Sequence, residues 1–115
     1  MTTEARAMIA RIWHGWTRPE DADGYEALLL EEIIPGIAAR EIDGYRGFEL
    51  LRRDVGGEVE FITILTFDSI EAVAEFAGPD HEAAYVPPKA RALLERFDER
   101  TRHYERRARG NAAAS

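Results

Sequence analysis

The stretch Met8-Ile-Ala-Arg-Ile-Trp-His-Gly-Trp16 decides how this chain folds. It is rich in β-branched and aromatic residues, which favours a β-strand. Because side chains alternate along a strand, Ile12 and Trp16 share one face while Ile9 and Trp13 share the other. A sheet with one wet face alternates apolar and polar residues, but here both faces carry large apolar groups. The pattern predicts a strand that is covered on both sides.

The stretch from Glu58 to Phe67 has the same property. Phe61 and Leu65 lie on one face, and Ile62 and Ile64 lie on the other. Gly56-Gly57 precedes it and predicts the tip of a hairpin, whose first strand runs over residues 45–53. The two strands of this hairpin form the second part of the predicted sheet.

Helices are predicted on either side of the hairpin. Pro19-Glu20-Asp21 is typical of a helix start, and the apolar residues after it repeat with helical spacing until Pro35-Gly36, which predicts a break. A second helix is predicted to start with Asp68 as its cap and to end at Gly78-Pro79. A short helix over residues 88–94 and a charged strand over residues 97–107 complete the chain.

The order strand, helix, strand, strand, helix, strand predicts a ferredoxin-like α+β domain, with a four-stranded antiparallel sheet and helices on one face. The 115 residues fit a single domain. Its core is expected over residues 7–107, with a disordered tail over residues 108–115.

The amino-acid composition argues against several classes of function. The formal net charge of −7 argues against binding of nucleic acid or of an anionic membrane surface. The chain has no cysteine, which excludes disulfides and thiolate metal sites. The first residues lack the pattern of a signal peptide, and no apolar stretch approaches the ~20 residues of a membrane span. We expect a soluble, cytoplasmic protein.

Several runs resemble a known family. They are residues 8–17 followed by an acidic helix, Gly44-Tyr-Arg-Gly-Phe-Glu-Leu-Leu-Arg-Arg53 leading into Glu58-Val-Glu-Phe-Ile-Thr-Ile-Leu-Thr-Phe-Asp-Ser69, and Val86-Pro-Pro-Lys-Ala-Arg91 with Phe97-Asp-Glu-Arg and His103-Tyr104 downstream. Over nearly the whole domain, the chain is similar to antibiotic biosynthesis monooxygenase (ABM) domains. The resemblance implies a dimeric α+β barrel, in which two protomers press their sheets together. It therefore implies a homodimer.

The resemblance implies a function in less detail than it implies a fold. Some members of the family oxygenate electron-rich aromatic molecules with O₂ and need no cofactor. The leading hypothesis is a cofactor-independent monooxygenase of this type, which binds a small aromatic molecule. The alternatives are a non-catalytic ligand-binding or stress-associated dimeric module and, as a weaker one, a heme-degrading monooxygenase. Fold alone does not decide among them.

Five residues are candidates for the site. His14 and Tyr85 are the candidate catalytic groups for proton transfer, because imidazole and phenol groups can exchange protons with an acidic substrate. Trp13, Phe76 and His81 are the candidate substrate-binding residues. Each has a plain structural alternative: core or interface packing for the rings, a hydrogen-bonded or solvated position for the histidines. The three scattered histidines lack metal-ligand spacing, and no cofactor is expected.

The resemblance also bears on heme. Heme-degrading relatives place an axial histidine on the segment after the second helix, where this chain offers Tyr85. Tyrosine ligates iron only when it loses its proton, and its ordinary pKa is ~10. We therefore predict that heme is not the native cofactor. His81, four residues earlier, is the residue that would reverse this prediction.

Overall fold

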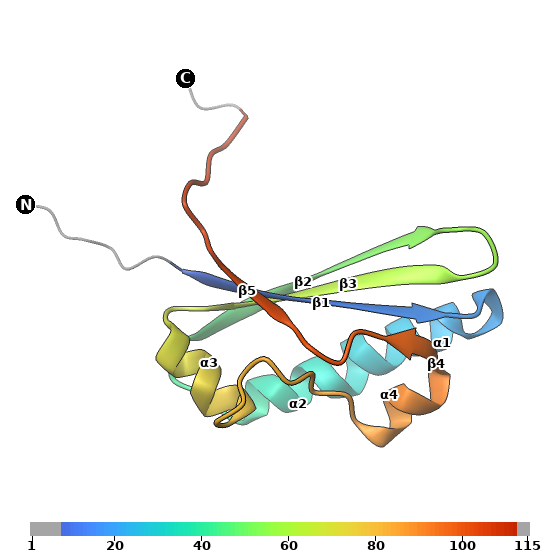
Figure 1. Ribbon diagram of the computed structural model, residues 1–115, viewed down its shortest axis with the longest axis horizontal. Coiled ribbons are helices and arrows are strands. Elements are labelled where there is room, and N and C mark those ends of the chain that lie inside the picture. The colour runs from blue at the N-terminus through green and yellow to red at the C-terminus, as the bar shows by residue number, and fades with distance from the viewer. Residues whose placement is uncertain (1–7, 113–115) are drawn as a thin grey trace, which may run out of the picture.

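The computed structural model describes residues 8–112, and the ferredoxin-like α+β fold is confirmed. The sheet is antiparallel, with the order β2-β3-β1-β4 and with β5 also paired to β1. Its long strands are β1 (Ile9–Thr17), β2 (Tyr45–Asp54) and β3 (Val59–Phe67). All the helices in this part of the chain lie on one side of the sheet (Figure 1).

The register between β1 and β3 separates two faces of the sheet. Arg11 pairs with Leu65, Trp13 with Thr63 and Gly15 with Phe61, so these residues share the face that the helices cover. The side chains between them point the other way and form what we call the open face; it includes Ala10, Ile12, His14 and Trp16 of β1, Glu60, Ile62, Ile64 and Thr66 of β3, and Leu51 and Arg53 of β2. Both faces of β1 and β3 carry large apolar side chains, as the sequence predicts.

The first helical segment does not break at Pro35-Gly36, contrary to expectation. It runs as η1 (Pro19–Asp21), α1 (Ala22–Leu28), η2 (Leu29–Ile33) and α2 (Ile34–Ala39). Proline removes one helical hydrogen bond and clashes with the carbonyl four residues back. Here η2 is a wider π-helical turn directly before the proline, and such a turn shifts the hydrogen-bond pattern where the proline cannot donate.

The N-cap of helix α3 (Ile70–Ala77) is Ser69, one residue after the predicted cap. The side chain of Ser69, and not that of Asp68, accepts a hydrogen bond from the backbone N–H of Ala72 at 3.2 Å. Asp68 instead forms an ion pair with Arg46 of β2. The helix ends at Gly78, whose φ of 90° favours glycine.

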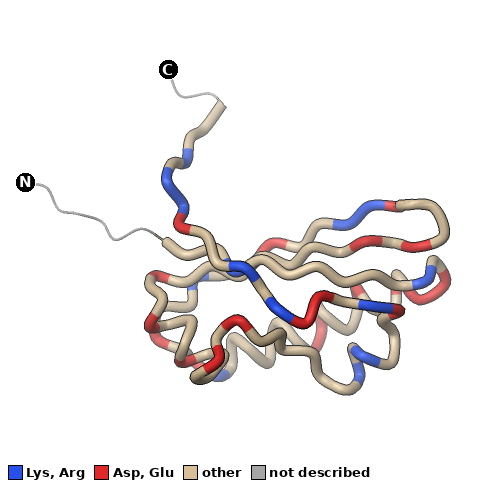
Figure 2. The backbone as a smooth tube through the Cα atoms, viewed as in Figure 1, with Lys and Arg blue, Asp and Glu red and all other residues tan. Residues whose placement is uncertain are grey.

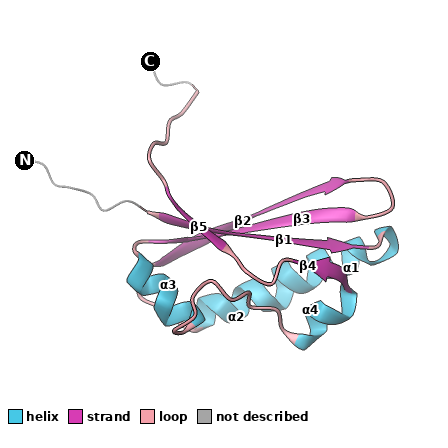
Figure 3. Ribbon diagram, in the orientation of Figure 1, coloured by secondary structure: helices cyan, strands magenta, loops and turns pink. Residues whose placement is uncertain are grey.

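The predicted last strand is interrupted. Helix α4 (Pro88–Leu93) leads into β4 (Leu94–Phe97), and β5 (Arg102–Glu105) follows after a gap. In the gap the chain turns away from β1 and hydrogen-bonds the loop between α3 and α4: Ala84 N–H donates to Glu99 O at 3.0 Å, and Thr101 N–H donates to Glu82 O. This loop runs below β5 in Figure 3.

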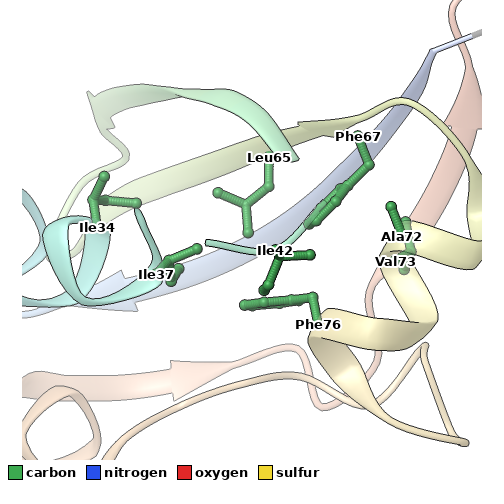
Figure 4. Packing of buried hydrophobic residues seen from close by; sticks show 8 residues of the cluster. All are labelled: Ile34, Ile37, Ile42, Leu65, Phe67, Ala72, Val73 and Phe76. Atoms are coloured by element: carbon green, nitrogen blue, oxygen red, sulfur yellow. The ribbon is translucent and has the colours of Figure 1, made fainter. Parts of the chain in front are cut away.

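The core lies between the sheet and the helices and is divided into two clusters. One cluster joins β3 to α2 and α3 and is shown in Figure 4; it contains Ile34, Ile37, Ile42, Leu65, Phe67, Ala72, Val73 and Phe76. The other joins β3 to α1 and α4 and contains Ala22, Tyr25, Leu29, Val59, Phe61, Val86 and Ala90. The division leaves space between them, which becomes the candidate site.

Charge is distributed unevenly along the backbone. Figure 2 shows Arg positions along β5 and the segment that follows it, while many Asp and Glu positions lie along the helices. Among residues 8–112, no helix has both the length and the apolar character to cross a bilayer. Residues 113–115 of the predicted disordered tail lie outside the described part of the chain.

Candidate functional site

A cavity separates the two core clusters. Its interior volume is about 50 Å³, it opens to solvent at its mouth, and it lies between the helix-covered face of the sheet and helices α1, α2 and α4. The sheet contributes Arg11, Trp13, Thr63 and Leu65, the helices contribute Tyr25, Leu29, Ile33, Ile34, Ile37, Phe76 and Ala90, and the remaining lining residues are Tyr85, Val86, Pro87 and Thr101. The lining is mainly apolar, with a few polar groups, as is typical of small-molecule sites.

Trp13 forms one wall of the cavity. Its indole lies over Gly15 of the same strand, so closely that a Cβ atom at position 15 would come within 2.5 Å of the ring. The indole N–H donates a hydrogen bond to Asp98 O at 2.7 Å, and the ring lies 6.1 Å from that of Phe97. Glycine at position 15 is therefore required for the close approach of the ring, and Trp13 is held rigidly.

Phe76 and Tyr85 form the opposite wall and the mouth. Their ring centroids are 5.7 Å apart in an edge-to-face arrangement. Phe76 is buried, whereas Tyr85 is 54% exposed. Outside Tyr85, the surface hollow at the mouth is edged by Lys89 and Glu32, which form an ion pair at 2.9 Å between α4 and η2.

Arg11 is the polar group that sequence reasoning missed. It is the third residue of β1 and is only 3% exposed. Its Nη1 donates to His81 O, its Nη2 donates to Ala83 O at 2.9 Å, and its guanidinium lies 5.2 Å from the ring centroid of Phe76. Burial lowers the pKa of Arg11 to about 10, which still leaves it charged at neutral pH.

His103 accepts the third hydrogen bond of Arg11. The distance from Arg11 Nη1 to His103 Nε2 is 3.0 Å. Since arginine can only donate, Nε2 carries the lone pair and the ring proton lies on Nδ1, which is buried without a partner in the described chain. Burial, and after it the charge of Arg11, lowers the pKa of His103 to about 4. His103 is therefore neutral at physiological pH.

Two hydroxyl groups of the lining, those of Thr63 and Tyr25, lie in the buried part of the site. Thr63 Oγ1 is buried without a hydrogen bond. The ring of Tyr25 packs edge-on against Phe61, with centroids 4.9 Å apart, and burial raises the pKa of its phenol. Both hydroxyls can donate to a ligand in the cavity.

The structure brings some predicted site residues together and separates others. Trp13, Phe76 and Tyr85 all line the cavity. His81 lies beside it: its carbonyl holds Arg11, and its ring is 5.5 Å from that of His103. His14 lies on the open face, where its Nδ1–H donates to Glu60 at 2.9 Å and its ring stacks on Trp16.

His14 is thus part of a second polar cluster, on the far side of the sheet from the cavity. Glu60 accepts from both His14 and Arg53, and these hydrogen bonds, that of His14 first, lower the pKa of its carboxyl. Trp16, whose ring lies 3.9 Å below the guanidinium of Arg96, flanks the cluster. Half-buried and exposed apolar side chains continue it across the open face, among them Ile62 and Leu51.

Neither a protein-family model nor a curated protein matches this sequence. Solved structures do match its fold. A Bacillus cereus protein described as an antibiotic biosynthesis monooxygenase superposes with a TM-score of 0.64 at 13% identity, over 91% of this chain and 98% of that one. A NIPSNAP family protein from Agrobacterium tumefaciens gives 0.62 at 20% identity, over 92% and 91% of the two chains.

An oxygenase with described chemistry is also among the matches. SnoaB from Streptomyces nogalater, a cofactor-independent oxygenase, superposes with a TM-score of 0.50 at 15% identity, over 94% of this chain and 99% of that one. At these identities the likeness concerns the fold. The chain has the fold of the ABM domains that its sequence resembles.

Proposed function

We propose that this protein is a monooxygenase-like enzyme that uses O₂ and no cofactor to oxidise a small, electron-rich aromatic molecule in the cavity between the two core clusters. The observation that carries the proposal is the cavity itself. Unfilled core space costs a protein about 24 cal/mol per Å³, so keeping the 50 Å³ interior of this cavity empty costs about 1 kcal/mol. Its rigid aromatic walls suit a flat ring.

The proposed reaction needs few catalytic groups from the protein. A substrate with a CH₂ group between aromatic rings and opposite a carbonyl, such as an anthrone, loses a proton to give a carbanion. The carbanion reduces O₂, one oxygen atom becomes the new carbonyl and the other leaves as water, so a quinone is formed. In this scheme the protein holds the ring and favours the anion. SnoaB, with the same fold, is described as a cofactor-independent oxygenase, which supports this class of reaction.

Tyr85 is the predicted proton-transfer group that lines the cavity. His14 is separated from it by the sheet, so a catalytic role for His14 requires a second site on the open face. We propose that a second copy of the chain covers this face, because it carries uncovered apolar side chains, such as Ile62 and Leu51, and an exposed patch of this kind favours association. The protein would then act as a homodimer.

Heme does not suit the cavity. No histidine is among its lining residues, and His81 uses its backbone to hold Arg11 while its ring faces His103. These residues support the proposal that catalysis does not involve heme.

A non-catalytic ligand-binding module is the second candidate. The specific observation in its favour is that no carboxylate or imidazole group is among the residues that line the cavity, so a conventional general base is missing there. Such a module would bind the same aromatic molecules and leave them unchanged.

Oxygen consumption separates the two candidates. The purified protein is mixed with a panel of anthrones and quinols in an oxygen electrode, with protein-free samples as the reference for spontaneous oxidation. An enzyme raises the rate in proportion to protein concentration. No acceleration, together with thermal stabilisation of the protein by the same compounds, would instead support the binding module.

A further inference from the structure

We infer that Arg11 is an anion-binding group, and that the ligand of the cavity is an aromatic molecule that presents an ionised oxygen to its guanidinium. The inference rests on the proposed function, since it names the substrate class of the same cavity. The inference also goes beyond the proposed function, because the same geometry would select anionic ligands whether or not a reaction follows.

The first argument is the missing counter-charge. A buried charge is normally paired with an opposite charge, since removal of an ion from water costs several kcal/mol. Among residues 8–112, no carboxylate forms an ion pair with Arg11, and no Asp or Glu lines the cavity. Ion pairs do form at many other arginines in this part of the chain, such as Arg18, Arg46 and Arg100, all of which are exposed.

The second argument is the number of donors. A guanidinium has five N–H groups, and Arg11 directs three of them to His81 O, Ala83 O and His103 Nε2. The N–H on Nε and one on Nη2 have no partner in the described chain. Thr63 Oγ1, on the neighbouring strand and diagonal to Arg11, is a further donor without a partner. The cavity therefore offers donors and a positive charge but no acidic acceptor.

A purely structural role does not account for this arrangement. Arg11 does fix the loop at residues 81–83 to the sheet, but carbonyl oxygens can be satisfied by a neutral donor. His103 also adds no negative charge, because it is neutral and accepts only through Nε2. The positive charge itself is explained by an anion that binds next to it, where a low dielectric strengthens the attraction. A phenolate or an enolate fits the proposed chemistry, and an aromatic carboxylate would make the same contact.

Matched ligands test the inference without any turnover. The probes are 2-hydroxy-1,4-naphthoquinone, which is an enolate at neutral pH, its neutral ether 2-methoxy-1,4-naphthoquinone, and 2-naphthoate. We expect the protein to bind the enolate at least tenfold more tightly than the ether in calorimetry at low salt. The naphthoate arm tells whether a carboxylate serves equally well. Equal affinity for the enolate and the ether would overturn the inference.

Two variants test whether Arg11 is the source of the preference for the anionic ligand. In Arg11→Met the preference for the anion should fall to within twofold, with the ether still bound. Arg40→Met is the matched control, because Arg40 also lies over the ring of Phe76, at 5.1 Å, but is exposed and does not line the cavity. It should keep the preference. A folded Arg11→Met protein that still prefers the enolate would overturn the assignment.

A spectroscopic measurement on the unmodified protein remains decisive if Arg11→Met does not fold. A nitronaphthol changes colour when it ionises. Burial in an apolar cavity alone raises the pKa of a phenol, whereas a neighbouring cation lowers it. We expect the bound nitronaphthol to ionise at lower pH than the free one, and an upward shift would contradict the inference. If no substrate consumes oxygen but these results hold, the proposed reaction fails and the anion site stands. If Arg11→Met consumes oxygen as fast as the unmodified protein, the proposed reaction stands and the assignment of Arg11 as the anion-binding group fails.

Discussion

The two faces of the sheet use the same strands for different purposes. The helix-covered face buries Phe61 and Phe67 completely and keeps a cavity between its two clusters, with a cation at the sheet that lacks a counter-charge. On the open face His14, Glu60 and Arg53 are paired with one another, but the apolar groups are not covered. We therefore propose a ligand next to the unpaired charge and a second copy of the chain over the uncovered apolar surface.

The largest effect is expected from truncation on the helix-covered face. Phe67 is fully buried and contacts the rings of Tyr45 and Phe76, with centroids 5.5 Å and 5.7 Å away. Phe67→Ala should lower the free energy of unfolding by about 3–5 kcal/mol, measured by urea denaturation. Leu51→Ala, on the open face and 47% exposed, is the control. If Leu51→Ala proved equally destabilising at every protein concentration, the two faces would not differ as described.

Association should depend on the open face. At micromolar concentration the protein is expected to sediment at twice its mass of 13.0 kDa. Ile62→Asp places a charge in the centre of the open face and should shift the sedimenting species to a single chain, because a buried, unpaired carboxylate opposes sheet-to-sheet contact. Leu30→Asp, at an exposed apolar position on the helical side, should leave the assembly unchanged. A wild-type protein of 13.0 kDa would exclude the homodimer.

A smaller, pH-dependent effect is expected at Glu60. Its carboxyl pKa is lowered in the folded protein, so its contribution to stability is present above the unfolded pKa of ~4.3 and is lost as the pH falls through the lower folded value. Glu60→Gln should cost about 1 kcal/mol at pH 7, since charge-assisted hydrogen bonds are replaced by neutral ones. The difference between wild type and variant should shrink in acid. A constant difference between pH 7 and pH 2.5 would show that the charge of Glu60 is not responsible.

The sequence predicts the fold more completely than the site. Both apolar faces, the hairpin at Gly56-Gly57 and the order of elements follow from local patterns. Alternation along the first strand also places Arg11 on the face of Trp13. Its burial was not predictable, because the carbonyls that hold it come from residues 81 and 83, about 70 positions away. An arginine in the middle of an otherwise apolar stretch was the available signal.

The smallest effect concerns the two residues predicted to transfer protons, which the sheet separates. Tyr85 is half-exposed at the mouth and contacts Phe76 through its ring, so Tyr85→Phe should change stability by less than about 0.5 kcal/mol. If its hydroxyl acts on the substrate, Tyr85→Phe lowers the rate of oxygen consumption and leaves ligand affinity within twofold. If only the ring matters, Tyr85→Phe has no effect on oxygen consumption and Tyr85→Ala weakens ligand binding.

His14→Gln is the comparison on the open face. It should alter stability or association but not the affinity of the cavity, unless the cavity continues through the second copy. A loss of ligand affinity in His14→Gln, with Tyr85→Phe unaffected, would move the catalytic site from the helix-covered face to the open face.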